Sequence, residues 1–122
     1  MKMTPGDVAD RYSILLLKHQ RLPFNAETDR ELVEMGSAYK EEGVTTEEFA
    51  ALYKANGDIF TLEAELKAGK LNNAQTDAEF AHIGRVALAV RNINAGRIEA
   101  RNAINKRLGG FIEVKGNHCS EK

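Results

Sequence analysis

The chain has 122 residues, of which 17 are Lys or Arg and 18 are Asp or Glu, and its formal net charge is -1. This length suffices for one domain with a modest core, and the nearly balanced charge argues against a general nucleic-acid binder. One cysteine excludes an intrachain disulfide, the sequence has no apolar run of membrane-spanning length, and residues 1–7 lack the apolar core that is typical of a signal peptide. We therefore expect a cytoplasmic protein that does not associate with membranes.

The first helix is predicted from residue 5 to about residue 22. Thr4 is a good N-cap, Pro5 suits the first helical position, and Pro23 ends the helix. Its apolar surface is broader than one face, so we expect cover from more than one side, within the bundle or from another copy. The apolar residues are Val8, Tyr12, Leu15, Leu16, His19 and Leu22, with Ile14 and Leu17 beside them.

The second helix is predicted from residue 26 to residue 42, with Asn25 as its N-cap and Gly43 after its end. Its apolar face is thin, which predicts a position at the edge of the domain. This face consists of Leu32, Met35 and Tyr39.

The third helix is predicted from residue 46 to residue 68, because Thr45 and Glu48 have the spacing of a capping box. Two polar residues, Asn56 and Glu63, interrupt its apolar stripe. The other members of the stripe are Phe49, Leu52, Ile59, Phe60 and Leu66.

A long helix follows over residues 80–108, opened by a second capping box at Thr76 and Glu79 and closed by two glycines. Residues 111–115 are predicted to be a short extended segment and residues 116–122 a flexible tail. We thus expect one helical domain over residues 1–115. The fold class is a small all-α bundle of about four helices, built on a long antiparallel hairpin.

The long helix carries a conflict, because polar residues lie within its apolar stripe. The apolar members are Ile83, Val86, Ala87, Val90, Ile93, Ile104 and Leu108, and the polar members are Asn94, Arg97 and Arg101. A buried arginine requires a partner. Antiparallel packing of the third helix on the fourth brings Asn56 and Glu63 towards these side chains, so we expect Glu63 to pair with one of the arginines. Two interpretations remain open: a structural ion pair that fixes register, or a pocket for an anion.

Several short motifs of the chain also resemble, in the same order, motifs of a known family of proteins. They are Thr4-Pro5-Gly6-Asp7, Asp10-Arg11, Ser13-Ile14-Leu15 and Lys18 in the first helix, Asn56, Phe60 and Glu63 in the third, and Asn94, Arg97, Arg101 and Asn105 in the fourth. In these motifs the chain resembles a family of small bacterial and phage proteins of uncharacterised function, which opens with Ser-Pro-Gly-Glu. That family has Trp where this chain has Phe60, and Asp where it has Ala64, so a role for paired acids is in doubt. The resemblance implies an all-helical fold and no established chemistry.

The function that we expect is non-catalytic binding, including sequestration, of a small anionic ligand such as a nucleotide or signalling nucleotide. Phage genomes often encode small helical oligomers with that role, and the analogy is one of class alone. The expected site residues are Arg97, Arg101, Asn94, Asn56, Glu63, Arg11 and Lys18. The alternative is a protein-interaction or scaffold module in which the polar network is structural. We expect a homo-oligomer, no cofactor, no metal and no enzyme, because no phosphate loop or catalytic set is recognisable.

Overall fold

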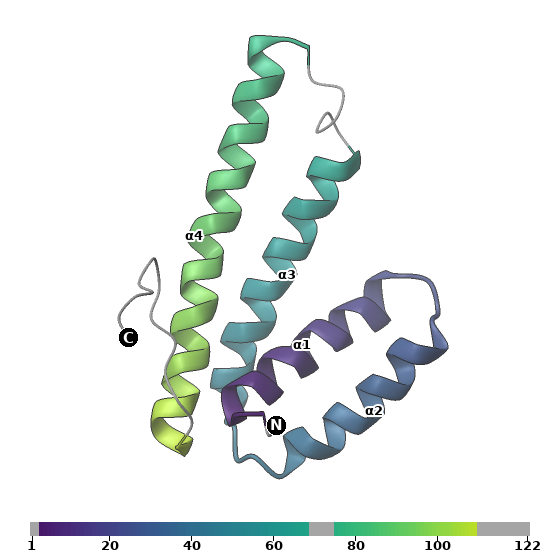
Figure 1. The fold of residues 1–122 in the computed structure, drawn as a ribbon, viewed down its shortest axis with the longest axis vertical. Coiled ribbons are helices and arrows are strands. Elements are labelled where there is room, and N and C mark those ends of the chain that lie inside the picture. Colours follow the sequence, from purple (N-terminus) through teal and green to yellow (C-terminus); the bar gives the residue numbers. More distant parts are fainter. Residues whose placement is uncertain (1–2, 69–74, 110–122) are drawn as a thin grey trace.

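The computed structural model describes residues 3–68 and 75–109. These residues form four helices, α1 (Pro5–Arg21), α2 (Ala26–Lys40), α3 (Thr46–Ala68) and α4 (Asp77–Leu108), which confirms the all-α fold class. The helices α3 and α4 form a long antiparallel hairpin, and α1 and α2 form a shorter hairpin that packs against its lower half (Figure 1). The first half of α4, residues 77–93, runs beyond α1 beside the end of α3, and we call these residues of α4 the arm.

The helix starts follow the predicted capping residues. The Thr4 hydroxyl accepts a hydrogen bond from the backbone of Asp7 at 3.1 Å, and Asn25 caps α2 in the same way at 3.0 Å. Both predicted capping boxes are formed, at Thr45 and at Thr76. Gly109 ends α4 with a φ of 95°, in the left-handed region that a side chain would disfavour. The predicted segments at residues 111–115 and 116–122 lie outside the described residues.

The core is small and lies where α1, α3 and α4 meet. Its fully buried large side chains are Leu15 and Leu17 of α1, Leu52 of α3 and Ile104 of α4. The helix α2 has no buried residue, which confirms its predicted place at the edge, and it ends two residues earlier than expected. Within residues 3–68 and 75–109, no helix is long and apolar enough to cross a membrane.

Three aromatic rings join α2 to α1 and α3. Tyr12 stacks on Tyr39 with 4.8 Å between ring centroids, and Tyr39 contacts Phe49 at 5.1 Å. Such ring pairs stabilise a fold beyond the area that they bury. Burial, followed by the neighbouring Tyr12 and Glu48, raises the pKa of the Tyr39 phenol. The thin face of α2 therefore docks through Tyr39, and Glu31 and Asp29 of α2 add ion pairs to α1.

The broad apolar surface of α1 is covered in part within the chain. Leu17 is fully buried, and Ile14, which is half-buried, lines a hollow between α1, α3 and α4. Of the two sources of cover that the sequence leaves open, the bundle itself covers Leu17 fully and Ile14 in part, and an oligomer stays a prediction.

An ion pair joins the end of α4 to the start of α3. Arg107 of α4 donates to both carboxylate oxygens of Glu48, at 2.8 and 2.6 Å, and to the carbonyl of Gly43 at 2.9 Å. Hydrogen bonding to Arg107 lowers the pKa of Glu48 from 4.5 to about 2. The same contact raises the pKa of Arg107. This two-oxygen contact is the strong, directional kind of ion pair.

Candidate ligand-binding groove

One buried carboxylate, that of Asp10, joins three helices. Asp10 in α1 is 6% exposed. It accepts hydrogen bonds from Arg97 Nη1 of α4 at 2.9 Å and from Asn56 Nδ2 of α3 at 2.8 Å. Arg101 Nη1 lies 3.5 Å from the same carboxylate. A buried charge needs such partners, because desolvation without them is costly.

Ser13 completes this network one turn further along α1. Its hydroxyl donates to the carbonyl of Asp10 at 2.7 Å and accepts from Asn56 Nδ2 at 2.8 Å. Because a carboxylate can only accept, the contact with Asp10 fixes which end of the Asn56 amide is nitrogen. The described residues supply no hydrogen bond to Asn56 Oδ1, although the residue is only 7% exposed. A buried acceptor without a partner is rare and calls for an explanation.

The start of α1 lies directly against α4, and a glycine makes this possible. A Cβ at Gly6 would lie 2.6 Å from the Arg101 carbonyl oxygen and 2.9 Å from Asn105 Oδ1. Instead, the Gly6 N–H donates to Asn105 Oδ1 at 2.7 Å, which satisfies one of the free donors of the helix start. Asp7 lies 3.8 Å from Arg101 Nε, so a second carboxylate faces the arginines.

The structure corrects the predicted partner of the arginines. Arg97 pairs with Asp10, and Arg101 lies between Asp10 and Asp7. Glu63 is exposed, and within the described part of the chain no ion pair joins it to Arg97 or Arg101. Two carboxylates thus balance two guanidiniums. Within one chain the predicted pairing of Glu63 is wrong, because the polar face of α1, and not α3, supplies the carboxylates that meet the arginines.

A signal for the missed carboxylate does exist in the sequence. Gly6, Asp10 and Ser13 recur at helical spacing, so they share one face of α1 beside its apolar stripe. Small and polar residues at such spacing allow a close approach of another helix and supply hydrogen bonds to it. This face therefore predicts the contact with α4 that the structure contains.

Beside the network lies a hollow of about 280 Å³, which we call the inner hollow. Arg97 contributes to its wall, and this side chain is held in place by Asp10 and by a 3.0 Å hydrogen bond from Nε to Asn94 Oδ1. The walls combine apolar side chains with a few polar ones, which is the usual composition of a small-molecule site. The lining residues are Ile14, Leu17, Asn56, Ile59, Phe60, Glu63, Asn94 and Arg97.

A second hollow of about 330 Å³, the outer hollow, shares Phe60 and Glu63 with the first. We call the two together the groove. The outer hollow adds two cations, Lys18 at the end of α1 and Lys67 near the end of α3, together with Leu22 and Ala64. Over the described residues neither lysine has an ion-pair partner. Arg21 lies over the Phe60 ring at 5.7 Å and donates to Thr61 at 2.8 Å, which holds this side of the groove in shape.

The structure brings five of the seven predicted site residues to the groove. Four of them line the inner hollow and Lys18 lines the outer one; the four are Asn56, Glu63, Asn94 and Arg97. Arg101 belongs to the Asp10 network and does not line either hollow. Arg11 is on another face, where it pairs with Glu31 of α2 at 3.3 Å. Phe60 and Lys67 were not among the predicted site residues, although both lie on the same helix as Glu63.

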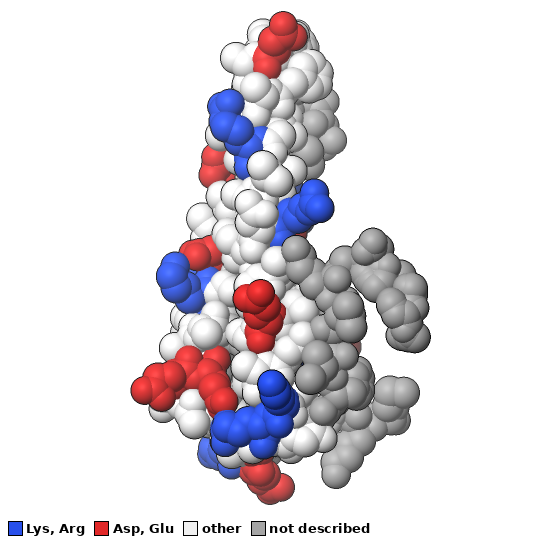
Figure 2. Space-filling view, turned by 90° about the vertical axis from the view of Figure 1, so that its left-hand side faces the viewer, with Lys and Arg blue, Asp and Glu red and all other residues white. Residues whose placement is uncertain are grey.

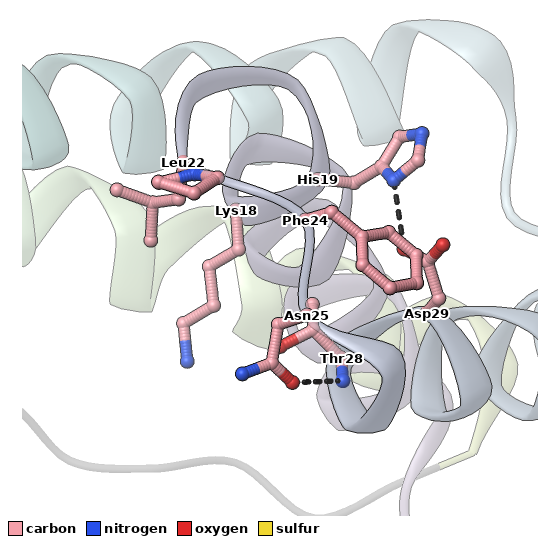
Figure 3. Close-up of a pocket in the computed structure, with 8 residues that line it drawn as sticks. Lys18, His19, Leu22, Phe24, Asn25, Thr28 and Asp29 are labelled. Carbon is pink, nitrogen blue, oxygen red and sulfur yellow. Dashed lines mark hydrogen bonds and ion pairs between the residues drawn. The ribbon is translucent and has the colours of Figure 1, made fainter.

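Another hollow, of about 370 Å³, lies at the turn between α1 and α2 (Figure 3). Apart from Lys18, which also lines it, its charged and amide side chains have structural partners: Asp29 pairs with His19 Nδ1 at 2.9 Å, and Asn25 accepts from the Thr28 N–H at 3.0 Å. The Lys18 side chain extends away from the His19–Asp29 pair (Figure 3). This hollow is therefore a feature of the turn, and we place the candidate site in the groove.

No group of three or more His, Cys, Asp and Glu side chains that could hold a metal occurs over residues 3–68 and 75–109. Compared with models of known families, with curated proteins and with solved structures, the chain matches none of them.

Proposed function

We propose that the protein binds a small amphiphilic anion of the nucleotide class in the groove, without chemically changing it. The observation that carries this proposal is the meeting of unpaired cations with an apolar wall. Lys18 and Lys67 lie at one end of the groove, and the half-buried apolar side chains of Phe60, Ile14 and Ile59 line it. The fold has no evident need for two unpaired ammonium groups at this position.

The charge of the groove favours a ligand with one or two negative charges. The arginines are balanced by Asp10 and Asp7, so they add little net attraction for an anion. Lys18 and Lys67 then face a single acid, Glu63. Because Lys67 is exposed to water and Lys18 is only half-buried, their attraction is screened by salt, and binding should weaken as ionic strength rises.

A second candidate function is a protein-interaction or scaffold module, and the closed Asp10 network favours it. In that case Arg97, Asn56 and Asp10 serve only to fix how α1 crosses the α3–α4 hairpin. The role would resemble that of polar residues that fix the register of helices in coiled coils. This candidate leaves the unpaired lysines and the free Asn56 oxygen without a role.

We further propose that copies of the chain associate through the outward face of the arm. Phe80 and Leu88 there are 58% and 53% exposed, and Ala81 and Gly84 lie between them. A Cβ at Gly84 would meet no atom within 4 Å, so this face is open to close contact. Along the arm, uncharged surface separates a few scattered charged side chains (Figure 2). Exposed apolar surface of this kind is typical of an interface.

Thermal denaturation with a panel of phosphorylated compounds tests the binding proposal. A ligand at a hundred times its Kd should raise the stability of the wild-type chain by about 2.7 kcal/mol. The double variant Lys18→Gln/Lys67→Gln should lose most of this stabilisation, whereas Lys40→Gln, an exposed position on α2, should keep it. If no compound of the panel stabilises the wild type, the binding proposal fails and the scaffold function takes its place.

A further inference from the structure

The polar groups of the groove occur in a definite order. Of the two hollows of the groove, the amides of Asn56 and Asn94 line only the inner one, and the ammonium groups of Lys18 and Lys67 line only the outer one; Lys18 also lines the hollow at the α1–α2 turn. Glu63 lines both and therefore lies between them. Along the groove, from the inner hollow to the outer one, the polar groups are the two amides with Arg97, whose charge is paired with Asp10, then the carboxylate of Glu63, and then the two ammonium groups. A ligand that fills both hollows should carry matching groups in the same order.

We propose that the groove takes a nucleoside monophosphate, with its base in the inner hollow, its ribose at Glu63 and its phosphate between Lys18 and Lys67. This inference rests on the proposed function and names the ligand class of the same site. Base, sugar and phosphate follow one another along a nucleotide in the order in which the groove presents amides, carboxylate and cations.

The inner hollow offers complementary groups to the edge of a base. Asn56 uses both donor contacts of Nδ2 within the fold, on Asp10 and Ser13, so only its buried Oδ1 is left to accept. Asn94 uses Oδ1 to accept from Arg97 Nε, so its Nδ2 is left to donate. One free acceptor and one free donor suit a base edge that carries an amino group beside a ring nitrogen. The amino group would supply the donor that Asn56 Oδ1 lacks.

Glu63 and the lysines suit the rest of the molecule. A carboxylate only accepts hydrogen bonds, so Glu63 fits the two hydroxyls of a ribose and repels a phosphate. The Phe60 ring, which lines both hollows, offers an apolar surface next to the base and sugar. Phosphate is then directed to the outer end, where Lys18 and Lys67 have no other partner among the described side chains.

Calorimetry with AMP, 2′-deoxy-AMP, adenosine and ribose 5-phosphate tests this order. The wild type should bind AMP about tenfold more tightly than 2′-deoxy-AMP, which is the effect of one lost hydrogen bond to a charged group. The variant Glu63→Gln should reduce that preference. The variant Lys18→Gln/Lys67→Gln should weaken AMP at least about tenfold and leave adenosine unchanged. Ribose 5-phosphate, which lacks the base, should bind more weakly than AMP.

Each variant changes exposed or half-exposed side chains, so circular dichroism should show an unchanged fold, with Lys40→Gln as the matched control. If AMP binds but the wild type does not distinguish it from 2′-deoxy-AMP, or if the lysine variant weakens adenosine and AMP equally, the proposed order is wrong while binding itself stands. If neither AMP nor any other phosphorylated compound binds, the proposed function fails together with this inference.

Discussion

Replacing Asp10 by Ala should destabilise the fold more than any surface change. The carboxylate is 6% exposed and accepts two short hydrogen bonds, from Arg97 at 2.9 Å and from Asn56 at 2.8 Å. Each hydrogen bond to a charged group contributes roughly 1.5–3 kcal/mol, and breaking a buried pair on one side costs roughly 3–5 kcal/mol. We therefore expect the free energy of unfolding to fall by about 3–5 kcal/mol, a large part of the roughly 5–15 kcal/mol of a typical domain.

Urea unfolding followed by far-UV circular dichroism measures this change, because the chain contains no Trp that could serve as a fluorescence probe. The matched control is Glu31→Ala, which removes a pair with Arg11 whose side chains are 41% and 47% exposed and should cost at most about 1 kcal/mol. A double-mutant cycle of Asp10→Ala with Arg97→Ala should give a coupling energy of about 0.5–3 kcal/mol. Equal losses for Asp10→Ala and Glu31→Ala would refute the reasoning.

Three further predictions concern packing, pH and assembly. Gly6→Ala should destabilise the fold by about 1–3 kcal/mol, because its Cβ would lie 2.6 Å from the Arg101 backbone oxygen. Gly96→Ala should stabilise the fold by about 0.5–1 kcal/mol in the same urea assay, because its Cβ would meet no atom within 4 Å. Equal effects of the two glycine changes would contradict the close approach of α1. The folded-state pKa of Glu48 is about 2, below its ordinary 4.5, so its contribution is complete above about pH 4.5 and is lost as pH falls towards 2. Between these pH values the free energy of unfolding should fall less steeply with acid for Glu48→Gln than for the wild type. Parallel plots of this free energy against pH would contradict the role of this ion pair. Leu88→Glu should shift sedimentation of the chain towards the monomer without lowering its helix content, and a wild type that sediments as a monomer at high concentration would exclude association through the arm.

The helices were predictable because their signals are local. A cap such as Thr76 with Glu79, or a terminal Gly109, acts within one turn, and the structure contains both. The helix α2 ends at Lys40, two residues before its predicted end, and Glu41 is its C-cap. Such shifts are ordinary at helix ends, which fray and tighten.

The groove was predictable only in part, because it depends on which faces meet. Asn56, Glu63, Asn94 and Arg97 could be chosen since polar residues in an apolar stripe require an explanation. The partner of Arg97 could not be obtained from the stripes of two helices, because the third helix of the contact, α1, crosses the hairpin and brings in Asp10. Long-range pairing of this kind follows from tertiary packing and not from helical periodicity.

The most direct test of the binding account is a titration of the isotopically labelled chain with AMP, followed by two-dimensional NMR. The signals that shift should be those of the groove, with the side-chain amide of Asn94 and the backbone amides of Phe60, Glu63 and Lys18 among the largest changes. No shift at millimolar AMP, or shifts confined to the turn around Phe24, would contradict the account.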